Sequence, residues 1–136
     1  MKCISTNCKR NFDINVFLDA EKKFAIKIRK EIIDFVKMNA GGYPVKDIVI
    51  FNDEEYEIRV FLSADRKDHD YCIEKPMNYF LKKTQGKIIP IGIDSGDNYY
   101  CIHNKTGKVY YWTHGEDKYY LLTATLNEFI DCFKNI

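Results

Sequence analysis

The feature that most constrains the fold is a pair of strand-like runs joined by a short turn in the last third of the chain. Residues 98–103 and 108–113 are rich in Tyr, Ile, Val and Trp, which favour extended backbone. Between them, Asn104-Lys105-Thr106-Gly107 places glycine where a turn of this length needs a positive φ. The pattern predicts a β-hairpin, so the rest of the chain must build on an antiparallel sheet.

A second pair of strand-like runs lies nearer the middle of the chain. Residues 48–51 and 57–62 are rich in Ile, Val and Phe, and the segment Asn-Asp-Glu-Glu at 52–55, which is mostly acidic, lies between them. The simplest interpretation is another hairpin, with 52–55 as its loop.

The remaining strand signals flank the first hairpin. Residues 87–93 predict a strand in which Pro90 requires either an edge position or a bulge, because proline lacks the N–H of a ladder bond. A tight turn at 94–97 follows it. A last strand is expected near residues 118–122.

Helical periodicity begins near the N-terminus. From Asp19 onward, apolar residues recur every three to four positions and predict one amphipathic helix. The helix must stop at residues 39–44, because Gly41 and Gly42 supply a left-handed cap and Pro44 cannot continue the hydrogen-bond ladder. The stripe consists of Phe24, Ile28, Ile32, Phe35 and Val36.

Two shorter helices are expected later in the chain. Residues 76–83 fit a helix with proline in its first turn, ended by Gly86. Thr125 and Glu128 have the spacing of a capping box, which opens a C-terminal helix. The apolar stripe of that helix is Leu126, Phe129, Ile130 and Phe133.

This order of elements predicts an α+β fold with an antiparallel β-sheet of about five to six strands. We expect helices packed mainly on one face of that sheet. The predicted division is an N-terminal arm or irregular edge at residues 1–18 and a single domain at residues 19–136.

Composition and targeting signals exclude several classes of function. The 21 basic and 20 acidic residues give a net charge of +1, so we expect no direct nucleic-acid partner and no membrane partner. The N-terminal residues lack a secretory signal, and no apolar run approaches the roughly 20 residues of a membrane span. Five cysteines without a CxxC pair indicate reduced thiols rather than a disulfide framework. A cytoplasmic protein is therefore expected.

Catalytic and metal-binding patterns are missing from the sequence. The histidines at 69, 103 and 114 belong to no recognised nucleophile, HExxH or metal motif, and no Gly-rich phosphate loop occurs. Asp94 and Asp97 flank Gly96 like part of a calcium loop, yet the remaining ligand series is absent. We therefore expect no catalysis, no metal and no cofactor.

Several segments, in the same order, are similar to those of one protein family. They include a helix that ends in Asn-Ala-Gly-Gly-Tyr-Pro at 39–44, an Ile-Pro-Ile-Gly strand at 89–92 and the turn and strand at 94–102. The stretch Gly-Lys-Val-Tyr-Tyr-Trp-Thr-His at 107–114 and the closing helix at 125–133 follow. Together they cover about residues 20–136 and resemble the SUKH superfamily, the fold of yeast glucan-synthesis regulators (Smi/Knr-type domains) and of many bacterial immunity proteins.

The resemblance implies a protein kept in the cytosol of a toxin-producing bacterium, where it binds a cognate toxin domain and blocks it by occlusion. A nuclease is one candidate toxin, because its basic surface would suit an acidic partner. Such a protein needs a complementary surface rather than an active site. The alternative is a regulatory adaptor of the same fold with a host-protein partner. The sequence leaves the oligomeric state open, with a monomer slightly favoured.

One acidic region is a candidate site for a basic partner, because complementary charge accelerates association. A solvated loop is the alternative interpretation, and the nearby Arg59, Arg66 and Lys67 dilute the charge. The region comprises Asp53, Glu54, Glu55 and Glu57, with Asp65, Asp68 and Asp70 a strand away.

Aromatic residues on successive strands form the second candidate. Strand alternation sends about half of them to each face, and tyrosine or tryptophan on an open face is a favoured interface anchor. For each aromatic residue, packing in the core or against a neighbouring strand is the alternative. Turn chemistry is the alternative role for Asp94 and Asp97. The candidate partner-binding residues outside the acidic region are Asp94, Asp97, Tyr99, Tyr110, Trp112 and His114.

Overall fold

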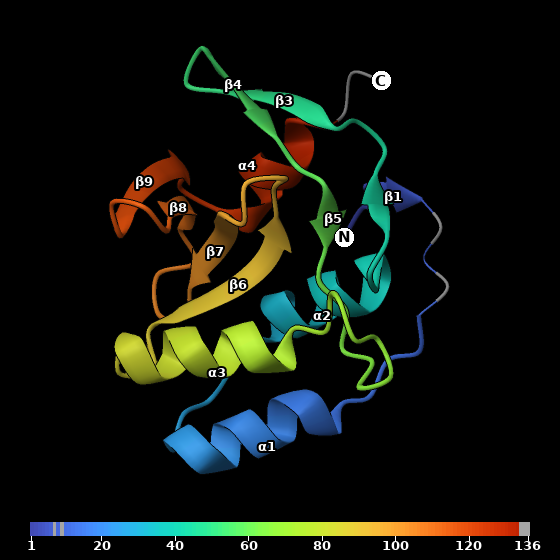
Figure 1. Cartoon of the computed structure of the whole chain (residues 1–136), viewed down its shortest axis with the longest axis vertical. Coiled ribbons are helices and arrows are strands. Elements are labelled where there is room, and N and C mark those ends of the chain that lie inside the picture. The colour runs from blue at the N-terminus through green and yellow to red at the C-terminus, as the bar shows by residue number, and fades with distance from the viewer. Residues whose placement is uncertain (7, 9, 134–136) are drawn as a thin grey trace.

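The computed structural model describes residues 1–6, 8 and 10–133 (Figure 1). Residues 7, 9 and 134–136, which the predicted arm and the predicted domain include, lie outside the described residues. The described chain contains the helices α1 (Asn15–Phe24), α2 (Lys30–Asn39), α3 (Glu74–Lys83) and α4 (Leu126–Asp131). None of these helices is long and apolar enough to cross a bilayer.

An antiparallel sheet of five strands lies at the centre, in the order β5-β6-β7-β8-β9. Two small sheets pair β1 with β2 and β3 with β4. The α+β prediction is therefore confirmed. The strands are β1 (Ser5–Thr6), β2 (Tyr43–Pro44), β3 (Ile48–Phe51), β4 (Glu54–Glu57), β5 (Val60–Phe61), β6 (Ile88–Ile93), β7 (Tyr99–His103), β8 (Val109–Thr113) and β9 (Lys118–Thr123).

The hairpin expected at 98–113 is confirmed as β7 and β8. Gly107 adopts a φ of 79°, the left-handed conformation that its turn requires. β6 lies inside the sheet, between β5 and β7, and its pairing with β7 shifts register between Pro90 and Gly92. Of the two positions that proline allowed, the bulge is the one observed.

The single helix expected from Asp19 onward is wrong, because α1 and α2 are separate. Ala25 takes a left-handed φ of 53° and ends α1. The connector is held by side chains from elsewhere: the Glu21 carboxylate accepts the Ile28 N–H at 2.8 Å, and the buried Asn104 carboxamide bonds the neighbouring backbone. The apolar period continues across the break, so the sequence pattern hides it.

The second hairpin is also displaced from its prediction. Its turn is only Asn52 and Asp53, whose φ angles of 52° and 65° are those of a type I′ turn. Glu54 and Glu55 therefore begin β4 instead of forming a loop. The predicted strand 57–62 is broken, since its first residue ends β4 and its later part is β5.

The two faces of the sheet pack against different helices. On the first face, Tyr100 of β7 joins a cluster that includes Phe35 of α2 and Phe129 of α4. On the second face, Phe80 of α3 packs edge-on against Trp112 of β8, with ring centroids 4.9 Å apart. The expected one-sided packing holds for α2 and α4, and α3 is the exception.

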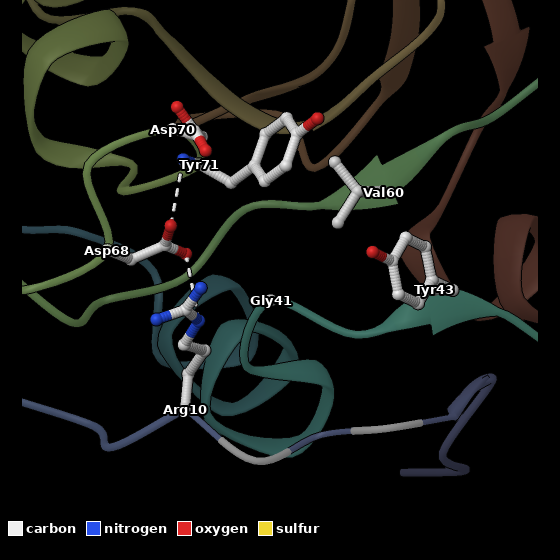
Figure 2. A pocket seen from close by; sticks show the side chains of 7 residues that line it. All are labelled: Arg10, Gly41, Tyr43, Val60, Asp68, Asp70 and Tyr71. Atoms are coloured by element: carbon white, nitrogen blue, oxygen red, sulfur yellow. Dashed lines mark hydrogen bonds and ion pairs between the residues drawn. The ribbon is translucent and has the colours of Figure 1, made fainter.

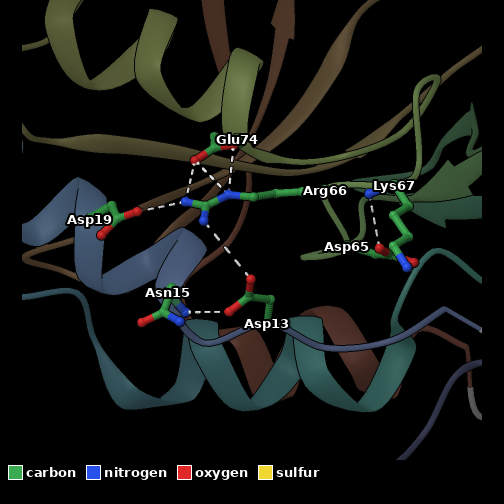
Figure 3. A network of polar contacts seen from close by, with 7 residues as sticks. All are labelled: Asp13, Asn15, Asp19, Asp65, Arg66, Lys67 and Glu74. Carbon is green, nitrogen blue, oxygen red and sulfur yellow. Dashed lines mark hydrogen bonds and ion pairs between the residues drawn. The ribbon is translucent and has the colours of Figure 1, made fainter.

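Arg66 ties the 63–72 loop to two helices (Figure 3). Its guanidinium lies 2.6 Å from Asp19 of α1, 2.7 Å from Glu74 of α3 and 3.9 Å from Asp13. Hydrogen bonds to the Glu74 and Asp19 carboxylates raise the pKa of the guanidinium above its usual range. The positive charge of Arg66 is therefore balanced locally, within the helical half of the molecule.

We expect Phe129→Ala to lower the free energy of unfolding by about 3–5 kcal/mol, because Phe129 is fully buried and truncation leaves a cavity. Urea denaturation measures the change. Asn127→Ala, on the exposed side of the same helix, should change it by less than about 0.5 kcal/mol. Equal midpoints for the Phe129 variant and the wild-type protein would contradict the docking of α4.

Candidate partner-binding surface

The β3–β4 hairpin extends from one end of the molecule and carries the first group of acidic residues (Figure 1). Asp53 is exposed at the turn, and Glu54 and Glu55 are exposed on β4. Among the described residues, no Lys or Arg lies within ion-pair distance of these carboxylates. Their negative charge is therefore available to a partner.

The inner side of this hairpin is fixed to the domain by aromatic packing. Phe51 stacks on Phe129 with centroids 5.3 Å apart and planes 5° from parallel. Tyr56 packs edge-on against Tyr111 of β8 at 5.3 Å. At the tip, the Asn52 carboxamide donates to the Leu121 carbonyl of β9 at 3.1 Å. The acidic residues thus sit on an anchored element.

The outer side of the hairpin is apolar and exposed. Ile48 and Ile50 keep 40% and 60% of their surface, respectively. Their cross-strand partners are Glu57 and Glu55, and opposed residues in an antiparallel pair share a face. We define the acidic hairpin surface as the exposed side chains of Ile48, Ile50, Asp53, Glu54 and Glu55.

Glu57 differs from Asp53, Glu54 and Glu55, because its carboxylate and its carbonyl are hydrogen-bonded to other parts of the chain. Its carboxylate accepts the Ser95 N–H at 2.9 Å and the Ser95 hydroxyl at 2.5 Å. The Glu57 carbonyl accepts the Tyr100 hydroxyl at 2.6 Å. Glu57 therefore joins the hairpin to the 94–97 turn and to the sheet.

Asp94 is only 8% exposed and organises the turn that Glu57 reaches. It accepts the Gly96 and Asn98 N–H groups at 2.9 and 2.8 Å, and the Asn98 carboxamide at 3.2 Å. The Tyr111 hydroxyl donates to it at 2.5 Å. Burial and this carboxylate raise the pKa of Tyr111 above its usual range. The contacts are those of a turn, the alternative role considered for Asp94.

Asp97 and His114 lie beside Asp94 and remain exposed. Asp97 has a positive φ of 63°, as tight turns require. The His114 N–H donates to the Asn98 side chain at 3.1 Å, and its ring nitrogen lies 3.1 Å from the Gly96 carbonyl. The structure therefore gathers these two residues near Glu57, at the edge of the acidic hairpin surface.

The predicted aromatic residues lie on the second face of the sheet, away from the acids. Trp112 is 5% exposed, and its indole N–H donates to Asp117 at 2.7 Å while Lys83 lies 5.0 Å above its ring. Trp112 therefore belongs to the core. Tyr99 is half-buried beside it, with centroids 6.1 Å apart. Tyr99 and Tyr110 line two separate open hollows, each of about 410 Å³.

The other predicted acidic residues do not join the hairpin. Asp65 and Asp68 are buried in the 63–72 loop. Asp68 accepts the Ser63 hydroxyl at 2.8 Å and lies 3.5 Å from the Arg10 guanidinium. Figure 2 shows Asp68 and Arg10 in a separate hollow of about 380 Å³, which Asp70 also lines. The expected combined acidic region is therefore divided between two places.

A family model described as the SMI1 / KNR4 family (SUKH-1) matches residues 13–132. The chain belongs to the SUKH-1 family. The match spans the whole of all four described helices and every described strand except β1. The SUKH resemblance seen in the sequence is thus confirmed. No curated protein matches the SUKH-1 chain at a significant level.

Sequence reasoning missed the apolar part of the SUKH-1 domain's candidate surface. Ile48 and Ile50 belong to a run of four apolar residues, which is typical of a strand buried on both faces. In a two-stranded hairpin, alternation exposes every second one. Tyr120 and Leu121 of β9 are also exposed. The feature that would have revealed the exposed isoleucines is the type I′ turn at Asn52 and Asp53, because it fixes which residues of β3 and β4 pair.

We expect Tyr111→Phe to destabilise the SUKH-1 domain by about 1–2 kcal/mol, because it removes one hydrogen bond from a buried carboxylate that keeps its N–H donors. Tyr56→Phe is the matched control. Its hydroxyl makes only a 3.4 Å exposed contact with Glu54, so the loss should stay below about 0.5 kcal/mol. Guanidinium denaturation compares the two, and equal losses would show that the Asp94 contact is unimportant.

His103 should titrate below the ordinary value of 6.5, because burial and the charges of Lys87, Lys105 and Lys108 lower its pKa. Since folding disfavours its proton, its contribution to stability is present above about pH 6.5 and declines as the pH falls. An NMR titration measures the pKa. Lys87→Gln should raise it towards 6.5, whereas Lys22→Gln on α1 should leave it unchanged.

Proposed function

We propose that this SUKH-1 domain is an immunity protein that binds a cognate toxin domain through the acidic hairpin surface and blocks it by occlusion. One observation carries the choice of surface. Segment 47–57 contains Asp47, Asp53, Glu54, Glu55 and Glu57 and no Lys or Arg, in a chain whose net charge is only +1. The same hairpin exposes two isoleucines on one side.

The composition of the acidic hairpin surface resembles that of a protein interface. Apolar side chains at the centre of an interface supply burial, and charged side chains at its rim supply specificity and a faster encounter. Ile48 and Ile50 provide the first, and Asp53, Glu54 and Glu55 provide the second. A toxin that acts on nucleic acid would present the complementary basic surface.

The rigidity of the hairpin favours this use. Its inner side is packed on Phe129 and Tyr111, so binding orders few groups that were free before. Occlusion is stoichiometric and asks for no chemical step from the chain. The proposal therefore assigns binding, and no catalytic role, to its residues.

Co-expression with the C-terminal domain of the protein encoded directly upstream tests the proposal, since a cognate toxin is expected at that position. An immunity protein should restore growth and co-purify with that domain as a stoichiometric complex. Unchanged toxicity together with no complex would overturn the proposal. An adaptor of the same fold would give that result, and would instead bind a host protein.

The acidic residues should act mainly on the association rate. Replacing Asp53, Glu54 and Glu55 with Ser should slow k_on about tenfold at low salt and change k_off little, because peripheral charges steer encounter. At 1 M salt the difference should almost vanish, since the Debye length falls to about 3 Å. Stopped-flow binding to the toxin domain measures both rates.

A matched control separates local charge from net charge. Asn15→Lys, Leu18→Lys and Gln85→Lys change the net charge by the same amount at exposed positions on and near α1 and α3. This variant should keep k_on within about twofold of wild type. Equal slowing by both variants would mean that the hairpin has no special role in encounter.

A further inference from the structure

Within the described residues, β3 pairs with a strand along only one of its edges. In the described part of the chain its sheet contains only β3 and β4, so no strand lies on its other side. Phe51 and Glu54 flank the two-residue turn and form a hydrogen-bonded pair, as the turn type dictates. Bonded and non-bonded pairs alternate, so the N–H and C=O groups of Ile48 and Ile50 point away from β4.

Contacts at the base of the hairpin agree with this alternation. Counted from the turn, the hydrogen-bonded pairs are 51 with 54, 49 with 56 and 47 with 58. The Ile58 N–H does donate to the Asp47 carbonyl, at 2.8 Å. On the opposite edge, the outward Glu57 carbonyl is taken by the Tyr100 hydroxyl. On the edge of β4 that faces away from β3, the Glu57 carbonyl is therefore hydrogen-bonded. The corresponding edge of β3 presents the N–H and C=O groups of Ile48 and Ile50.

The side chains at this edge favour strand addition. An exposed edge strand of β-branched residues is a template for pairing, and proteins usually protect such edges with a charge, a proline or a bulge. β3, Ile48–Phe51, has none of these on the strand itself. Its two outward-facing residues are also the two exposed isoleucines.

The charge beside the edge selects the occupant. A strand added to β3 would lie about 4.8 Å from it and about 10 Å from β4. A Lys or Arg on the outer face could lay its aliphatic stem over Ile48 or Ile50 and extend its charged end towards Glu55. A second copy of this chain fits poorly, because it would bring another acidic hairpin to the same place.

We infer that β3 accepts an extended segment of the partner as an added strand, with Lys or Arg at alternate positions over Ile48 and Ile50. This inference rests on the proposed function and names the chemistry of the partner at the same surface. Backbone bonds to β3 supply affinity, and the alternate basic side chains supply specificity.

Amide hydrogen exchange tests the inference on the wild-type protein, with a capped Lys-Val-Lys-Val-Lys-Val peptide as the probe. In the free protein, the Ile48 and Ile50 amides should exchange fast and those of Val49 and Phe51 slowly. Millimolar peptide should slow Ile48 and Ile50 at least about tenfold, and a Glu-Val-Glu-Val-Glu-Val peptide should not. No change with the lysine peptide, or equal protection by both, would overturn the inference. Protection that grows with protein concentration alone would show a second copy on β3.

A pair of variants separates backbone from side-chain recognition with the toxin domain. Ile50→Pro removes the outward N–H without removing a bond of the hairpin, and Ile50→Thr keeps that N–H and the branched side chain. The proline variant should bind at least about tenfold more weakly, and the threonine variant within about threefold of wild type. The amide spectrum confirms that each is folded.

The two failures are distinguishable. If the wild-type protein and Ile50→Pro bind the toxin domain equally, the proposed function stands and strand addition is wrong. If the wild-type protein does not bind the toxin domain at all, the proposed function is wrong, and the peptide experiment alone decides whether β3 accepts a basic strand.

Discussion

The stacking of Phe51 on Phe129 is the contact on which the rest of the structure depends. Phe129 lies on α4, and its ring also meets Phe35 of α2, Phe133 and Tyr100 of β7. One fully buried ring therefore connects two helices, the central sheet and the separate β3–β4 hairpin. Since a two-stranded hairpin is marginal alone in water, this contact allows β3 and β4 to persist as an ordered surface.

Packing of the hairpin's inner side also explains why its outer side is exposed. Strand alternation gives each face every second residue, so burying Val49 and Phe51 exposes Ile48 and Ile50. The carboxylate of Glu57, bonded to Ser95, holds the base of the hairpin against the 94–97 turn. The proposed binding face thus arises from the same contacts that fix the fold, and no separate flexible element is required.

Local signals predicted the parts of the fold that local chemistry decides. Gly107 and the tyrosine-rich runs specified β7 and β8, and Thr125 caps α4 by accepting the Glu128 N–H, as its spacing indicated. Long-range contacts decided the rest. The break between α1 and α2 depends on Asn104, far away in the sequence, and the exposure of Ile50 depends on what lies beside β3. The spacing of apolar residues along the sequence reveals neither the helix break nor the exposure of Ile50.

The net charge is near zero, yet the charged side chains are unevenly distributed over the domain, with acidic residues at one end and lysines on the second face of the sheet. At the hairpin end the carboxylates of Asp53 and Glu55 are unopposed among the described residues. On the second face of the sheet, around the hollow that Tyr110 lines, Lys87 and its neighbours are close enough to lower the pKa of His103. Such a separation of charge orients a charged partner during approach even when the total is small. A basic partner would therefore meet β3 first, the strand whose edge is proposed to bind it.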